Sequence, residues 1–144
     1  MASTREQIMQ TLEWRLRTIP NVTVRRNEVL RQAVPPGGMI VLRDSEPGEP
    51  DMTLGTVSYW YTHRVDLEVF VPALFDGTAE GRLDTLLTYI GATLSVDESL
   101  GGRAQMMSWG APDVSVVSMD GGPPILSALV AVVVEYQVSD PLQG

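Results

Sequence analysis

Apolar residues are most concentrated near the end of the chain, over residues 124–139, which read PILSALVAVVVEYQVS. Polar side chains enter this run only at Ser127, Glu135 and Gln137 before its last residue. The density of β-branched residues, with Gly-Gly-Pro-Pro at the start and Asp-Pro after it, favours a long strand over a helix. We therefore expect a central strand buried on both faces, with helices on one side and another layer on the other.

A second long strand is predicted over residues 56–71, where apolar and polar residues alternate. Its polar face carries Arg64, Asp66 and Glu68, which indicates ion pairing on a solvated face. His63, the one histidine of the chain, falls on the apolar face, where a satisfied core histidine is commoner than a catalytic one. Alternation also places His63 and Asp66 on opposite faces, so they do not form a catalytic pair.

Two helices are predicted from apolar residues at helical spacing. Ser3 and Glu6 have the spacing of a capping box, so the first helix is expected to begin near Thr4. The second is expected over residues 78–94, with Thr78 as its cap. The first helix should lie beside the second, over the long strands.

Shorter strands are expected at four places, over residues 22–26, 38–44, 103–109 and 113–119. The order is then helix, two strands, a long strand, a helix, and two or three strands. This order predicts one α+β domain spanning residues 1–144, with a mostly antiparallel sheet of four to six strands and two helices packed on one face.

The composition of the chain excludes several kinds of catalytic and metal site. The formal net charge is −8, all ten basic residues are arginine, and there is no cysteine or lysine. Thiolate metal sites, cysteine nucleophiles and Schiff-base lysines are therefore excluded, and zinc is disfavoured by the single histidine. An acidic chain is unsuited to binding nucleic acid through its phosphates. It is compatible with lining a channel through which DNA moves without being bound, because like charges repel. The first ten residues lack an apolar signal segment, so we expect an intracellular product.

Two features point to contacts and not to catalysis. Trp14 lies almost opposite the apolar stripe of the first helix, so either a neighbouring loop covers it or it contacts another subunit or partner. The loop over residues 45–55 carries Glu46, Glu49 and Asp51 among prolines and glycines. Its spacing does not fit a calcium loop, and a solvated or partner-facing arm is favoured. We find no catalytic constellation, so the chain is not expected to be an enzyme or to hold a cofactor or metal.

Four stretches of the chain resemble the tail terminator proteins (also called minor tail or tail completion proteins) of long-tailed bacteriophages and prophages. They are residues 35–50 (PPGGMIVLRDSEPGEP), the strand over 59–69 with His63, residues 83–102 (LDTLLTYIGATLSVDESLGG) and residues 134–142 (VEYQVSDPL). The resemblance implies a hexameric ring on the head-proximal end of the tail tube, which stops tube polymerisation and provides the docking surface for the neck. No catalytic residue belongs to that family.

The resemblance also implies the partners and the location. The expected partners are further copies of the chain, the tail tube protein and the head-proximal neck or connector proteins, while DNA crosses the lumen without specific binding. The expected place is the virion tail, after assembly in the cytoplasm of the bacterial host, with no membrane involved. Residues expected to face neighbours or the tube are Trp14, Arg25, Arg26, Arg31, Glu46, Glu49, Asp51 and Met52.

Two alternatives stay open. The chain could be a head-completion or neck protein of the same virion, which co-purification with portal or adaptor protein would indicate. It could also be a small-molecule binding domain or enzyme, for instance for an acyl group, with a pocket between the helices and the sheet. A monomer with a ligand-sized cavity would favour that second alternative.

Overall fold

The computed structural model describes residues 2–28, 34–53, 55, 57–73, 77–117 and 124–144. Within these ranges the chain forms two helices, seven strands and one short 3₁₀ turn. In order they are α1 (Thr4–Leu16), β1 (Thr23–Arg26), β2 (Met39–Arg43), β3 (Asp51–Met52), β4 (Tyr59–Pro72), α2 (Ala79–Ser95), β5 (Met106–Trp109), β6 (Asp113–Val117), β7 (Ile125–Val138) and η1 (Pro141–Gln143).

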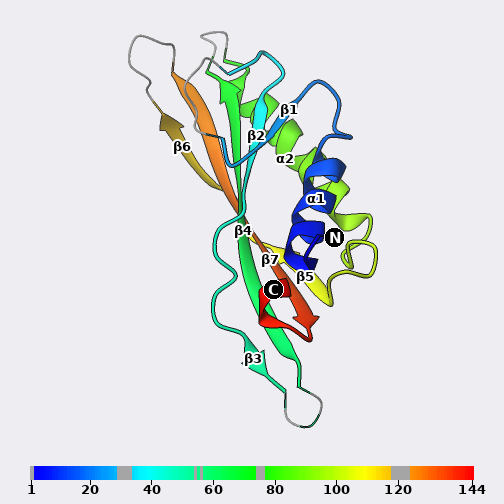
Figure 1. Cartoon of the computed structure of the whole chain (residues 1–144). Helices are drawn as coiled ribbons and strands as arrows, with labels where there is room; N and C mark the ends of the chain where they lie inside the picture. Colours follow the sequence, from blue (N-terminus) through cyan, green and yellow to red (C-terminus); the bar gives the residue numbers. More distant parts are fainter. Residues whose placement is uncertain (1, 29–33, 54, 56, 74–76, 118–123) are drawn as a thin grey trace.

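The α+β class predicted from the sequence is confirmed, with a mostly antiparallel sheet and two helices on one of its faces (Figure 1). The described part of the sheet has one strand more than the expected upper limit of six. The addition is β3, two residues within the loop over 45–55 that pair with the start of β4. So short a strand leaves no periodic pattern in the sequence.

The sheet is built on one long antiparallel pair. β4 and β7 pair over their whole length, from Tyr59 opposite Val138 to Pro72 opposite Ile125. The outer edge of β4 is shared by β2 and β3, and the outer edge of β7 is shared by β5 and β6. β1 extends the sheet by pairing with β2 in parallel. Two long strands therefore form a spine, and shorter strands line both of its edges.

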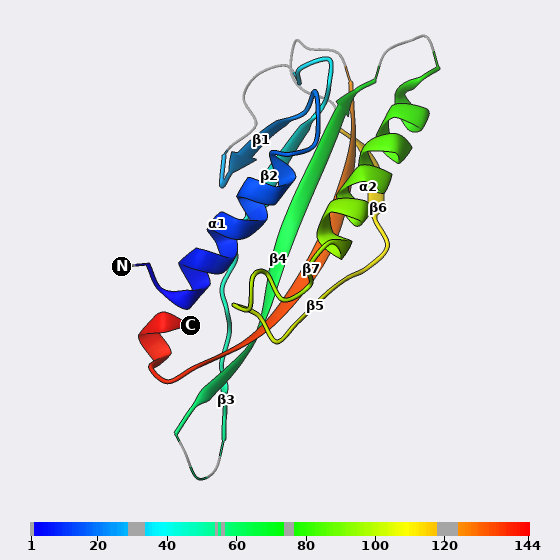
Figure 2. The ribbon, with the colours of Figure 1, turned by 90° about the vertical axis from the view of Figure 1, so that its right-hand side faces the viewer.

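The main core lies between this spine and the helices, which run side by side over the same face (Figures 1 and 2). Alternation turns one row of each long strand to this face, as predicted for β4. The helices close over those rows with their apolar stripes, which removes the apolar surface of both layers from water. Fully buried members of this core include Ile8, Leu12, Leu16, Leu42, Val65, Leu94, Val132 and Val134.

The opposite face of the sheet is only partly covered. A smaller cluster of Val34, Met39, Val41, Phe70 and Ile125 buries one end of it. Beyond that cluster, Leu129, Ala131 and Val133 of β7 are half-buried. The prediction that β7 is buried on both faces is therefore wrong for this row, because both described helices lie on the same face.

One segment projects beyond the helices at one end of the molecule (Figures 1 and 2). We call it the arm and define it as residues 45–53 and 57–60. Its two segments are joined to each other, because the backbone N–H of Thr53 donates to the carbonyl oxygen of Ser58 at 3.1 Å. The hydroxyl group of Ser58 also hydrogen bonds to Thr53 and accepts from the side-chain amide of Gln137 on β7. The arm is thus a shaped extension of the sheet.

Candidate functional site

The polar groups in the core have structural roles. His63 is fully buried, its Nε2 donates to the carbonyl oxygen of Asp44 at 2.6 Å, and its Nδ1 accepts from the hydroxyl group of Tyr136 at 3.2 Å. Burial lowers the pKa of His63, although the Asp44 carbonyl opposes this, and burial raises the pKa of Tyr136 to about 12. The prediction that His63 is a satisfied core histidine is confirmed.

Within the described ranges there is neither a metal-ligating cluster of side chains nor a membrane-spanning helix. No group of three or more histidine or acidic residues there is placed to hold a metal ion. None of the helices in those ranges is both long and apolar enough to cross a membrane. The candidate functional residues of the described ranges lie on the surface.

Trp14 lies on the solvent side of α1, and its side chain is 73% exposed. No described loop covers it, so the first of the two interpretations drawn from the sequence is wrong. Gln7, Gln10, Thr11 and Arg103 border a shallow depression beside the indole ring. A large exposed aromatic ring next to polar side chains is typical of a contact surface.

Arg25 and Arg26 are neighbours in β1, but alternation turns them to opposite faces of the sheet. Arg25 is exposed, and its nearest charged partner is Glu28 at 3.3 Å. Arg26 faces the helices, donates to both carboxylate oxygens of Glu6 at 2.7 Å, and donates from Nε to Asp44 at 2.8 Å. Arg26 therefore has a role within the fold, and its contact with a neighbour stays a prediction. Arg31, also expected at a contact, lies outside the described residues.

The positive charge of Arg26 keeps the carboxylates of Glu6 and Asp44 ionised. Hydrogen bonds from Arg26 lower the pKa of Glu6. Burial alone would raise the pKa of Asp44, but the hydrogen bonds and charge of Arg26 outweigh it, and the net direction is down. The arginine therefore ties two ionised carboxylates, one on α1 and one beyond β2, to β1.

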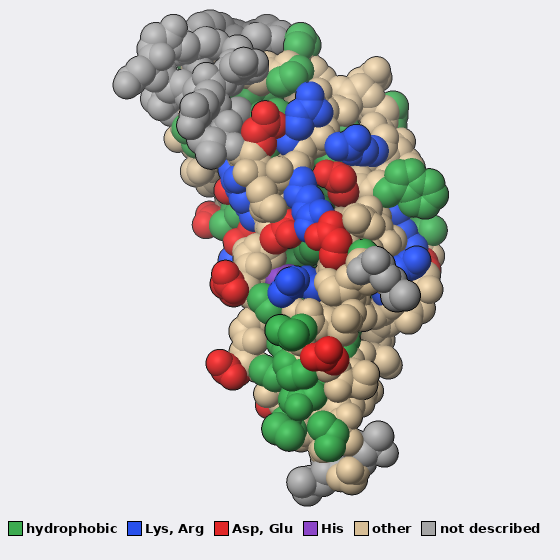
Figure 3. All heavy atoms as spheres, in the orientation of Figure 1, with side chains coloured by type: hydrophobic (Ala, Val, Ile, Leu, Met, Phe, Trp, Pro, Cys, Tyr) green, Lys and Arg blue, Asp and Glu red, His purple; other side chains and the backbone are tan. Residues whose placement is uncertain are grey.

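The other predicted contact residues lie together on the arm. Glu46 and Glu49 are exposed in its first segment, and Asp51 and Met52 form β3, with Met52 64% exposed. These carboxylates form no ion pair within the described residues. In Figure 3 apolar side chains gather at this end of the molecule, where Met52, Val57 and Leu142 are exposed. The arm thus presents an apolar surface flanked by acids.

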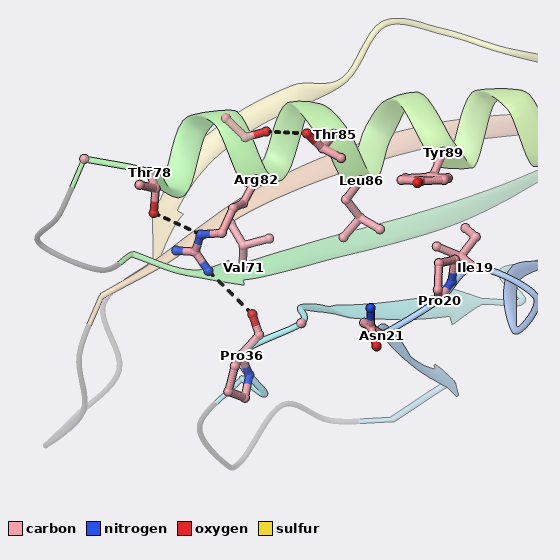
Figure 4. Close-up of a pocket in the computed structure, with 13 residues that line it drawn as sticks. Ile19, Pro20, Asn21, Pro36, Val71, Thr78, Arg82, Thr85, Leu86 and Tyr89 are labelled. Carbon is pink, nitrogen blue, oxygen red and sulfur yellow. Dashed lines mark hydrogen bonds between the residues drawn. The ribbon is translucent and has the colours of Figure 1, made fainter.

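A groove of about 640 Å³ lies beside α2 (Figure 4). Its walls are the N-terminal half of α2, the segment that follows α1 and the turn that precedes β2. The lining is apolar along most of its length and polar near Arg82. Its residues are Ile19, Pro20, Asn21, Pro36, Gly37, Val71, Gly77, Thr78, Gly81, Arg82, Thr85, Leu86 and Tyr89.

Arg82 is the charged side chain of the groove. It donates from Nη2 to the carbonyl oxygen of Pro72 at 2.7 Å. It also donates from Nη1 to the carbonyl oxygen of Pro36 at 3.5 Å and from Nε to the hydroxyl group of Thr78 at 3.2 Å (Figure 4). All three acceptors are neutral, and Arg82 forms no ion pair with another described residue. Thr78 occupies the N-cap position as predicted, but its side chain makes no capping hydrogen bond. Among the described residues, the cation of the groove therefore has no counter-charge.

Sequence reasoning did not identify this groove. Its walls come from three segments that are distant along the chain, and the approach of Pro36 to Arg82 joins residues 46 positions apart. No local spacing signals such a contact. The sequence did predict the arm, because an acidic segment rich in proline and glycine is recognisable as a loop from its composition alone.

Comparison with known proteins gives no family. No family model matches the chain, and no curated protein matches it. The class that the fold defines is an α+β domain built on a long two-stranded spine, with an acidic arm at one end and a groove at the other (Figures 1 and 4).

Proposed function

We propose that the chain is a structural subunit that assembles into a ring, and that the ring is the tail terminator of a long-tailed phage or prophage. The observation that carries the proposal is the exposure of large apolar side chains at separate places on one small domain, among them Trp14 on α1 and Met52 and Val57 on the arm. Soluble monomers rarely expose large apolar patches, whereas a subunit that assembles removes such surfaces from water.

The ring and its position on the tail tube come from the sequence resemblance. Several features of the structure are compatible with that role. The formal charge of −8 suits a lumen crossed by DNA, because like charges repel and prevent retention. The half-buried row on the outer face of β7 and the short edge strands β3 and β6 are surfaces that a neighbouring subunit can cover. The partners in this proposal are further copies, the tail tube protein and the neck.

The test is the mass of the purified protein by light scattering on a size-exclusion column, alone and mixed with the tail tube protein encoded in the same genome. We expect six times the chain mass of 15.7 kDa, either alone or on addition of tube protein. Negative-stain images should then show rings at one end of the tubes. A monomer that ignores tube protein would contradict the proposal. Assembly on portal or adaptor protein instead would assign the chain to the neck.

A second candidate is favoured by one specific observation, the groove. A volume of about 640 Å³ lies within the range of small-molecule sites, and the combination of an apolar lining with Arg82 would fit an amphipathic anion such as an acyl chain with an acidic head. Native mass spectrometry of the purified protein tests this candidate. A monomer that carries a constant added mass, lost on substitution of Leu86 by Trp, would support it.

A further inference from the structure

We propose that the occupant of the groove is the arm of a second copy of this chain. In this contact, β3 and the preceding Glu49 of one copy lie against Arg82 and the apolar wall of the next. The inference rests on the proposed function, because it identifies the neighbour in the ring as the partner of this surface. It goes further by naming the two surfaces that meet.

The geometry excludes a contact within one chain. β3 is fixed to the start of β4 by the pairing of Asp51 with Trp60, whereas Val71, near the other end of β4, lines the groove. Eleven residues of extended strand separate Trp60 from Val71, which is about 37 Å at 3.4 Å per residue. β3 and the N-terminal half of α2, which lines the groove, therefore lie toward opposite ends of the molecule (Figures 1 and 2).

A contact between opposite ends is heterologous, since each copy offers a different surface to each of its two neighbours. Repetition of such a contact gives a closed ring if the rotation between copies closes, and a filament if it does not. A two-fold dimer would instead bring identical surfaces together. The placement of arm and groove therefore favours a ring over a pair.

Charge is complementary across the proposed contact. The arm carries Glu49 and Asp51, which form no ion pair within the described residues. The guanidinium group of Arg82 has only neutral acceptors there. Arginine and carboxylate form strong, directional hydrogen bonds once water is excluded, so docking would give both charges their missing partner.

The apolar parts of the two surfaces are also complementary. Met52 stands exposed beside Asp51, and the groove offers Pro20, Pro36 and Tyr89 as its exposed apolar side chains. Methionine is flexible and adapts to irregular apolar surfaces. Because consecutive residues of a strand point to opposite faces, Met52 and Asp51 would meet different walls of the groove, one apolar and one cationic.

Both surfaces exist before docking, so little conformational entropy is lost on association. Ser58 links Thr53 of the arm to Gln137 of β7, and Pro47 and Pro50 restrict the backbone of the arm. In the groove, the three hydrogen bonds of Arg82 hold its guanidinium group in place.

Disulfide cross-linking tests the contact without background, because the chain has no cysteine. Met52→Cys and Thr85→Cys, made in separate chains, are mixed and oxidised with diamide. Thr85 lines the groove, and its hydroxyl group donates to the carbonyl oxygen of Gly81 within α2. We expect a cross-linked pair in the mixture, formed about 100-fold faster than between chains that meet at random. The doubly substituted chain should give a ladder that ends at the size of the ring.

The matched control replaces Thr85→Cys with Val96→Cys. Val96 directly follows the same helix and is 79% exposed, but it does not line the groove. The control pair should cross-link no faster than random encounter. Equal rates for the two pairs, or a Met52→Cys chain that links only to itself, would overturn the inference.

Charge reversal provides a second test. Asp51→Arg should weaken self-association at least tenfold and should leave the circular dichroism spectrum unchanged, because Asp51 is exposed. Combining Asp51→Arg with Arg82→Glu should restore part of the loss. Arg82→Glu alone removes three hydrogen bonds and can disturb the groove, so the decision rests on Asp51→Arg and its rescue. Unchanged association of Asp51→Arg would contradict the proposed contact.

Light scattering on the same samples separates the two proposals. An oligomer without the Met52–Thr85 cross-link overturns the arm contact and leaves the ring intact. A monomer without the cross-link, alone and with tube protein, overturns both. A monomer with a bound amphiphile in native mass spectrometry assigns the groove to a small molecule and also overturns the arm contact.

Discussion

At the scale of single residues, the described interior has no buried side-chain nitrogen or oxygen without a hydrogen-bond partner. The chain from Tyr136 through His63 to the backbone of Asp44 shows how this is achieved. A neutral imidazole serves as donor and acceptor at once, and protonation would leave Nδ1 unable to accept from the tyrosine. The neutral form is therefore part of the folded state.

Stability should consequently depend on pH through His63. Burial lowers its pKa in the folded state, so below about pH 6.5 the unfolded chain binds a proton that the folded chain does not. The free energy of unfolding should fall as the pH decreases from 7 to 5, by up to about 1.4 kcal/mol per pH unit. Urea unfolding at several pH values measures this slope.

The control is His63→Gln, which removes the one histidine of the chain. Its slope between pH 7 and 5 should be nearly flat. Glu6 and Asp44 do not contribute in that window. Their folded pKa values are lowered, so their stabilisation is lost only as the pH falls through and below the unfolded values near 4. Equal slopes in the two proteins would contradict the assignment to His63.

Backbone packing gives a second prediction at this scale. A Cβ atom at Gly37 would lie far inside contact distance of the carbonyl oxygen of Asn21. Gly37→Ala should therefore destabilise the protein by about 1–3 kcal/mol, because the backbone around the groove must shift. Gly91→Ala, in open space on α2, should instead stabilise by up to about 1 kcal/mol through lost freedom of the unfolded chain. Chemical denaturation of both variants measures the difference, and a neutral Gly37→Ala would show that this approach can relax.

At the scale of elements, Arg26 ties three parts of the fold together. Its guanidinium group bridges Glu6 on α1 to Asp44 just after β2, while Val24 of the same strand faces the core. The short strand β1 is thus held by its pairing with β2, by this ion cluster and by the burial of Val24. A four-residue strand at a sheet edge has few other contacts to hold it.

Adjacent arginines provide a matched pair for testing this role. Arg26→Ala should lower the free energy of unfolding by about 1.5–3 kcal/mol, since two partly buried carboxylates lose their charged donor. Arg25→Ala should cost less than about 1 kcal/mol, because its ion pair with Glu28 is exposed. Urea unfolding at pH 7 distinguishes them. Equal losses would show that the cluster adds nothing beyond a surface ion pair.

At the scale of the whole molecule, the proposed assembly predicts a role for the exposed side chain of Trp14. Trp14→Ala should change the stability of the monomer by less than about 0.5 kcal/mol, because its side chain contacts little within the chain. It should weaken self-association by about 2 kcal/mol or more if the indole ring is central to a contact. Light scattering over a dilution series measures the association. Val96→Ala is the control, and unchanged assembly of Trp14→Ala would remove that residue from the interface.

The sequence by itself determined the two long strands, the two helices and the solvated loop over residues 45–55. Each produces a periodic or compositional pattern that local chemistry explains, from valine alternation in β7 to the Ser3 cap of α1. It also predicted the core position of His63, because alternation fixes the face of a residue within a strand. The loop held a two-residue strand, β3, that is too short to carry such a pattern.

Only the tertiary structure decided which surfaces are left uncovered. Arg25 and Arg26 look alike in sequence, yet one is exposed and the other joins Glu6 and Asp44, because strand pairing and helix packing set their faces. The partial exposure of the outer face of β7 and the groove around Arg82 likewise arise from segments that meet across long sequence distances. Local patterns report which residues can be buried, whereas packing between distant segments decides which of them are.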